Sequence, residues 1–155
     1  MSQLFMGPIT DATARVLQTM AFTESQRGEL VIKTRNEPVQ GDVTGIIGWT
    51  GTMKGCLTIS FSEGAILHIL STMFGEPCKQ INQEVQDAVG ELSNMISGDA
   101  RRTLEDQGYL FQGALPTVVL GKGMRIVHMI KGPSYVVPFR VAGDQVFFVQ
   151  ACFES

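Results

Sequence analysis

The feature that most constrains the fold is a helical pattern that continues without a break over residues 83–107. Apolar residues recur along this stretch at three- and four-residue spacing, which is typical of a helix that buries one face. Gly108 follows directly and is expected to end the helix. The apolar positions are Val85, Ala88, Val89, Leu92, Met95, Ile96 and Leu104.

The chain after this helix is rich in strand-forming residues, and turn sequences divide it into short segments. Four strands are predicted, at residues 115–120, 124–130, 134–141 and 145–153. The turns between them are Gly121-Lys122-Gly123, Lys131-Gly132-Pro133 and Ala142-Gly143-Asp144.

The first half of the chain adds two shorter helices and a hairpin. Residues 8–22 carry one apolar stripe, and Pro8 suits the first turn of a helix. Residues 65–74 form a second helical stretch that Ser62 can cap. One strand is expected at residues 29–34. Two more, at 43–49 and 53–61, are expected to form a hairpin around Thr50-Gly51-Thr52.

Together these elements predict an α+β fold. We expect a mostly antiparallel sheet with a long central helix and two further helices packed on it, all on one side. The length of 155 residues fits a single domain over residues 1–155.

Composition excludes several classes of function. The net charge of −3 leaves no basic excess for nucleic acid. Cys56, Cys78 and Cys152 are too few and too dispersed for a disulfide framework or a zinc site, so partly buried, reduced thiols are expected. No apolar run approaches the roughly 18 residues of a membrane span, and the first eight residues do not have the pattern of a signal peptide. We therefore expect a cytoplasmic protein.

The polar face of the long helix carries the candidate site. At 100° per residue, five residues fall opposite the apolar stripe: Asp87, Glu91, Asn94, Gly98 and Arg101. Glu91 and Asn94 are three residues apart and therefore neighbours on the helix surface. Periodicity alone favours a solvated face with no chemistry. Gly98, however, costs roughly 1 kcal/mol against alanine, and it could provide a flat spot where another molecule comes close.

The sequence resembles the CheX-type members of the CheC/CheX/FliY family of chemotaxis phosphatases. The resemblance spans most of the chain, in order. An isolated E-x-x-N pattern is unspecific, but here it lies within a longer match. The matching segments are Gly41-Asp-Val-Thr-Gly-Ile-Ile-Gly-Trp-Thr-Gly51, Gln83-Glu-Val-Gln-Asp-Ala-Val-Gly-Glu-Leu-Ser-Asn-Met-Ile-Ser-Gly-Asp-Ala100 and Leu115-Pro-Thr-Val-Val-Leu-Gly121. Only one E-x-x-N motif is present, as in the CheX type; CheC-type relatives usually have two.

The resemblance implies that Glu91 and Asn94 are an active-site pair that dephosphorylates a phosphorylated CheY-type response regulator. Asn94 would orient the attacking water, and Glu91 would bind a lysine of the partner. The protein would need no cofactor of its own, because the phosphorylated partner would hold the Mg²⁺. Asp87, Gly98 and Arg101 are expected to contact the partner.

Other candidate residues are expected to be structural. His68 and His128 have no nearby Cys/His cluster, so they do not indicate a zinc site. The glycine-rich segment at residues 45–55 lacks the Lys-Ser/Thr of a phosphate-binding loop and is interpreted as a hairpin. The methionines are expected to fill the core. They are Met53, Met73, Met95, Met124 and Met129.

Two further questions stay open at the level of sequence. The strands at 136–140 and 146–153 are so apolar that either the helices cover them or they form a homodimer, which the CheX resemblance also implies. The protein could also be a non-catalytic module of the same fold that binds a response regulator or a flagellar-switch component. A small-ligand sensor is disfavoured, because no convergent polar set in an apolar pocket is evident.

Overall fold

The computed structural model describes residues 2–33, 39–126 and 130–154. Its elements, in chain order, are η1 (Ser2–Phe5), α1 (Met6–Met20), β1 (Gln26–Arg27), β2 (Val31–Lys33), β3 (Val39–Gly51), β4 (Gly55–Phe61), α2 (Glu63–Phe74), α3 (Gln83–Asp106), β5 (Phe111–Gly113), β6 (Thr117–Ile126), β7 (Ser134–Val141) and β8 (Gln145–Phe153).

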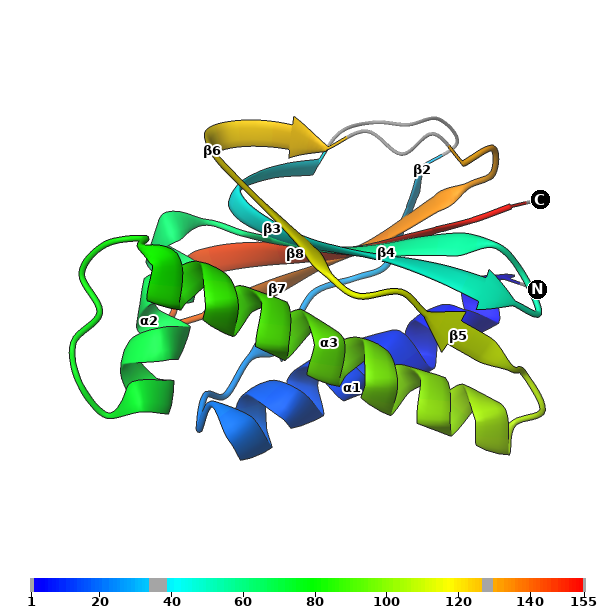
Figure 1. The fold of residues 1–155 in the computed structure, drawn as a ribbon, viewed down its shortest axis with the longest axis horizontal. Coiled ribbons are helices and arrows are strands. Elements are labelled where there is room, and N and C mark those ends of the chain that lie inside the picture. Colours follow the sequence, from blue (N-terminus) through cyan, green and yellow to red (C-terminus); the bar gives the residue numbers. More distant parts are fainter. Residues whose placement is uncertain (1, 34–38, 127–129, 155) are drawn as a thin grey trace.

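The strands form one sheet, and every strand pair in it is antiparallel. Its order is β1-β7-β8-β4-β3-β5, with β2 paired to β7 and β6 paired to β3. Figure 1 shows α1 and α3 on one face of the sheet, with α2 at its left end. The predicted α+β fold, with a long helix and two further helices packed on an antiparallel sheet, is confirmed.

Alternation along the strands places the core between the sheet and the helices. Leu57, Ile59 and Phe61 of β4 are buried on the helix side, as are Phe147 and Val149 of β8. The strand β8 lies between β7 and β4 and is therefore not a sheet edge. Burial beneath the helices thus accounts for much of the apolar character of the C-terminal strands.

The helices α2 and α3 both begin at a side-chain cap. Ser62 Oγ accepts a hydrogen bond from Ala65 N (3.2 Å) at the start of α2, which confirms the predicted cap. Asn82 Oδ1 accepts one from Val85 N (3.0 Å) at the start of α3. These caps satisfy amide groups that a helix leaves unpaired at its N-terminus.

The predicted turn at Gly121-Lys122-Gly123 is wrong, because β6 runs through these residues as one strand. The pairs Gly41↔Met124 and Val43↔Leu120 leave only Asp42 opposite three residues of β6, so the segment is a bulge. Asp42 holds it in place by accepting a hydrogen bond from Gly123 N at 2.8 Å. Its other oxygen accepts one from Glu63 N at 2.7 Å, which links the bulge to the start of α2.

The turn directly after α1 contains an unfavourable backbone conformation. Phe22 has a φ of 51°, in the left-handed region that favours glycine. The residue is 72% exposed, so little packing energy offsets this strain. Thr23 N closes the end of the helix by donating to Leu17 O (2.9 Å).

We expect Phe22→Gly to raise the free energy of unfolding by about 1 kcal/mol, because it relieves this strain and loses little buried area. Urea unfolding measures the change. Phe22→Ala is the matched control, since it removes the ring but keeps the strain. A Phe22→Gly protein no more stable than Phe22→Ala would contradict the expectation.

The cysteines are free thiols, as predicted; Cys56 and Cys78 are partly buried and Cys152 is buried. Cys56 and Cys152 are opposite each other on β4 and β8. Burial, with a smaller contribution from Cys152, raises the pKa of the Cys56 thiol to about 11. Cys56 is therefore protonated and unreactive near neutral pH.

Candidate functional site

The polar face of α3 has the geometry that the sequence predicts. Asp87, Glu91 and Asn94 are exposed, at intervals of one helical turn, while Leu92 and Ile96 on the opposite face are buried. Within the described residues, the side chains of Glu91 and Asn94 form no hydrogen bond or ion pair. Their polar atoms are therefore available to a partner.

These three residues lie along a groove between α3 and the start of β6. Figure 1 shows the N-terminal part of β6 running beside α3. The groove is lined by Gln83, Gln86, Asp87, Gly90, Glu91, Asn94, Leu115, Pro116 and Val118. The helix supplies a polar and acidic wall. The start of β6 and the two residues before it supply an apolar wall, in which Leu115 is 86% exposed.

Gly98 and Arg101, the other two predicted site residues, lie outside this groove. They line a second hollow further along α3, together with Glu105, Leu110 and Gln112. Arg101 Nε donates to Ser97 Oγ (3.4 Å), and a Cβ on Gly113 of β5 would lie 3.0 Å from the same nitrogen. Asp87, Glu91 and Asn94 therefore line one groove, while Gly98 and Arg101 line the next hollow along the same helix.

Two contacts with β3 fix the position of the part of α3 that carries Glu91 and Asn94. Trp49 is buried, and its Nε1 donates to Ser97 Oγ on α3 (2.8 Å). At Gly45, an added Cβ would collide with Ser93 Oγ and lie 2.9 Å from Ser93 Cβ. Because Ser93 directly precedes Asn94, the missing side chain at Gly45 sets how closely the site lies to the sheet.

Gly90 has no such packing requirement. A Cβ there would lie 3.5 Å from Val118 Cγ2 and 4.0 Å from Pro116 Cγ, which are ordinary contact distances. A glycine inside a helix costs about 1 kcal/mol against alanine, so Gly90 carries a cost that the fold does not demand. Gly90, Leu115 and Pro116 were not predicted as site residues. An isolated glycine inside a helical pattern is the signal that could have identified Gly90.

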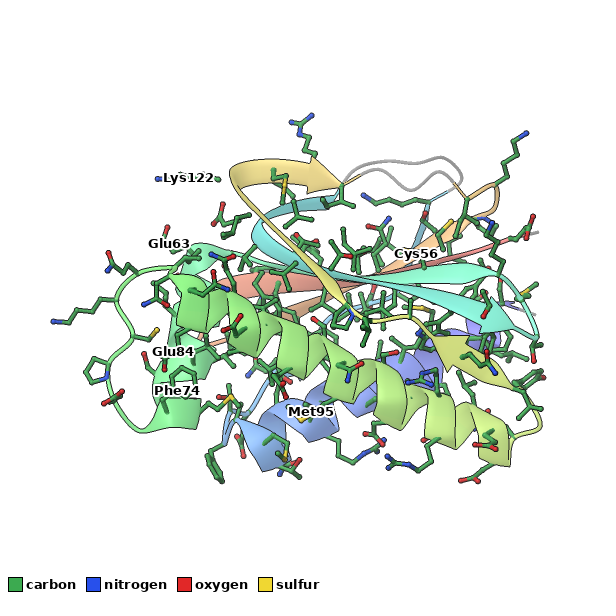
Figure 2. The ribbon with its side chains drawn as sticks, viewed as in Figure 1. Cys56, Glu63, Phe74, Glu84, Met95 and Lys122 are labelled. Carbon is green, nitrogen blue, oxygen red and sulfur yellow. The ribbon has the colours of Figure 1, made fainter. Side chains whose placement is uncertain are left out.

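Among the described residues, the other candidates lie outside the groove. Met53, Met73 and Met95 pack against the core, and Met95 lies on the side of α3 that faces α1 (Figure 2). His68 is exposed on α2. His128 and Met129 lie outside the described residues.

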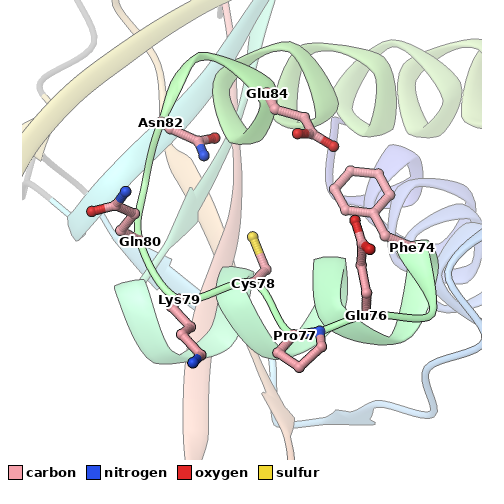
Figure 3. A pocket seen from close by; sticks show the side chains of 8 residues that line it. All are labelled: Phe74, Glu76, Pro77, Cys78, Lys79, Gln80, Asn82 and Glu84. Carbon is pink, nitrogen blue, oxygen red and sulfur yellow. The ribbon is translucent and has the colours of Figure 1, made fainter.

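A third concave region, shown in Figure 3, lies at the connection between α2 and α3. It is lined by Phe74, Glu76, Pro77, Cys78, Lys79, Gln80, Asn82 and Glu84. Two of its polar groups are already used, because Cys78 N donates to Ser71 Oγ (2.8 Å) and Asn82 caps α3. Across the described ranges, no group of three His, Cys, Asp or Glu residues is placed to hold a metal ion.

Comparison with known proteins identifies the family. The family described as chemotaxis phosphatase CheX matches residues 43–140. The chain belongs to this CheX family. The CheY-P phosphatase CheX of Thermotoga maritima is 37% identical over 111 residues, which cover 71% of this chain and 70% of that protein. In the part of the chain that is described, no helix is both long and apolar enough to span a bilayer.

Solved structures of CheX proteins share the fold. The chemotaxis protein CheX from Vibrio vulnificus is 39% identical, with a TM-score of 0.90 over 97% of this chain and 99% of that one. The CheX in a CheX–CheY–BeF₃–Mg²⁺ complex from Borrelia burgdorferi is 23% identical, with a TM-score of 0.82 over 97% of this chain and 98% of that one. At 23% identity, the comparison with the Borrelia protein shows a shared fold alone.

Proposed function

We propose that this CheX-family protein hydrolyses the aspartyl phosphate of a CheY-type response regulator that docks in the groove between α3 and β6. The observation that carries the proposal is the pair Glu91 and Asn94, one helical turn apart, exposed and not engaged by the described residues. The relative that is 37% identical to this chain is named a CheY-P phosphatase.

The proposed chemistry requires little from the protein. An aspartyl phosphate is a mixed anhydride: water bonds to phosphorus, the bond from phosphorus to the carboxyl oxygen breaks, and inorganic phosphate and a free carboxylate result. Phosphoryl transfer of this kind depends chiefly on positioning and on charge stabilisation. The Asn94 amide can hold the water in line through its carbonyl oxygen and NH₂ group. The partner would hold the Mg²⁺, so the chain needs no cofactor of its own.

Glu91 has a different proposed role. Its carboxylate would form a charge-assisted hydrogen bond with a lysine of the partner and so fix α3 in the partner's cleft. Asp87 lies one turn earlier in the same groove and adds a second negative charge. Gly98 and Arg101 would take part only if the partner also covers the second hollow. With a partner of this class, the protein would act in the cytoplasm.

A phosphate-release assay tests the proposal. Receiver domains from the same organism are phosphorylated with acetyl phosphate, and the loss of phosphate is followed with and without the purified protein. We expect acceleration for one or a few receivers. If no receiver is accelerated, the phosphatase function is wrong; if a receiver binds without acceleration, the non-catalytic binding module replaces it.

We also propose a homodimer through the C-terminal strands, on the face of the sheet away from the helices. Pro138 and Phe148 are paired across β7 and β8, and with Val146 they form the half-buried apolar part of a hollow that Arg27 and Arg140 also line. A second copy could cover this surface.

Light scattering after size-exclusion chromatography should give about twice the chain mass of 16.9 kDa at micromolar concentration. Phe148→Glu should give the monomer mass, because it places a charge in the contact. A wild-type monomer at this concentration would remove the dimer proposal.

A further inference from the structure

The apolar wall of the groove is unusual in its exposure. Leu115 has the most exposed large apolar side chain among the described residues. A single exposed leucine needs no explanation, but this one is continuous with Pro116 and Val118 and faces the helix that carries Glu91 and Asn94. It is therefore part of a surface that extends to the proposed site.

Gly90 lies at the bottom of the same groove, between its two walls. It lies on α3 opposite Pro116 and Val118, directly before Glu91. An alanine would fit this position in the free protein, as the contact distances show, but its methyl group would occupy the space between the two walls. The glycine weakens the helix and leaves this space open.

We propose that Gly90, Leu115 and Pro116 form an apolar subsite that receives an apolar side chain of the receiver domain, next to its phosphorylated aspartate. This inference rests on the proposed function and extends it to the way the partner is recognised. The groove is acidic on the helix side, at Asp87 and Glu91, and apolar on the strand side. Its complement is a surface with a basic residue beside an exposed apolar side chain.

Gly90→Ala separates this role from a structural one. The helix gains a better helix former, so we expect the melting temperature to rise by about 2–4 °C. The added methyl group should raise the KM for the phosphorylated receiver about tenfold, while kcat should change less than twofold. The Kd for the same receiver loaded with BeF₃⁻ and Mg²⁺, measured by calorimetry, should rise by the same factor. Gly7→Ala is the control: it is also a helical glycine, it has nothing within 4 Å of an added Cβ, and it should not change KM.

Leu115→Ser tests the apolar wall. Because Leu115 is exposed, the melting temperature should change by less than about 2 °C, while KM and Kd should rise about tenfold. Leu4→Ser removes another exposed leucine, on η1 and outside the groove, and should change neither constant.

The outcomes distinguish this inference from the proposed function. If the wild type is active, and both Gly90→Ala and Leu115→Ser keep wild-type KM and Kd, the subsite is wrong and the phosphatase function stands. If the wild type neither binds nor dephosphorylates any receiver, both are wrong. A KM that rises in Gly90→Ala together with a fall in melting temperature would indicate structural damage and would also overturn the subsite.

Discussion

Asn94→Ala is expected to lower kcat for phosphate release at least 100-fold, while the Kd for the phosphorylated receiver stays within about threefold. Loss of one positioned polar group in an active site costs about 10²–10³ in rate, and here that group would hold the attacking water. The side chain is exposed and makes no hydrogen bond with the described residues. The free energy of unfolding should therefore change by less than about 0.5 kcal/mol.

Glu91→Gln is the informative comparison, because it removes a charge and keeps the shape of the side chain. It should act mainly on KM and weaken the salt dependence of binding, since the proposed contact is ionic. Rapid-quench measurement of phosphate release over a range of receiver concentrations separates the two constants. Full activity in Asn94→Ala would contradict the proposed role of the amide. Equal losses of kcat in both variants would contradict the assignment of catalysis to Asn94 and of binding to Glu91.

Gly45→Val is expected to lower the free energy of unfolding by about 2–3 kcal/mol. A Cβ at this position collides with the hydroxyl of Ser93, so α3 would have to move away from the sheet. Because Ser93 directly precedes Asn94, the movement would also displace the site relative to β6. We therefore expect activity to fall together with stability, measured by urea unfolding and phosphate release on the same preparation.

Gly48→Val is the matched control on the same strand. Gly48 is exposed, and an added Cβ there meets nothing within 4 Å, so the change in stability should stay within about 0.5 kcal/mol. If Gly45→Val is as stable as Gly48→Val, the close approach of α3 to β3 is not what Gly45 provides.

The parts of the fold that the sequence predicts depend on local interactions. The long helix follows from its own periodicity, and the cap at Ser62 from a hydrogen bond three residues away. The segment Gly121-Lys122-Gly123 was interpreted wrongly because glycines suit both a turn and a bulge. Asp42 decides between them, and it is 81 residues away in the chain. The strands β1 and β5 were not predicted, because two or three residues carry no period of their own.

The same limit applies to the site. Helix geometry places Asp87, Glu91 and Asn94 on one face, and the structure agrees. It also places Gly98 and Arg101 on that face, but β5 lies against the later turns of α3 and gives them different surroundings. Leu115 and Pro116 lie directly before β6, in a segment that reaches α3 only in the folded protein, so no pattern within the helix could predict them.

The two walls of the groove have a consequence for how such proteins can diverge. The polar wall belongs to α3 and the apolar wall to the start of β6 and the residues directly before it, so the two walls are encoded by separate stretches of the chain. Selection could change the residues around Leu115 to discriminate among the many receivers of one cell while Glu91 and Asn94 stay the same. Duplicated copies of the gene could then acquire different partners while the catalysed reaction stays the same.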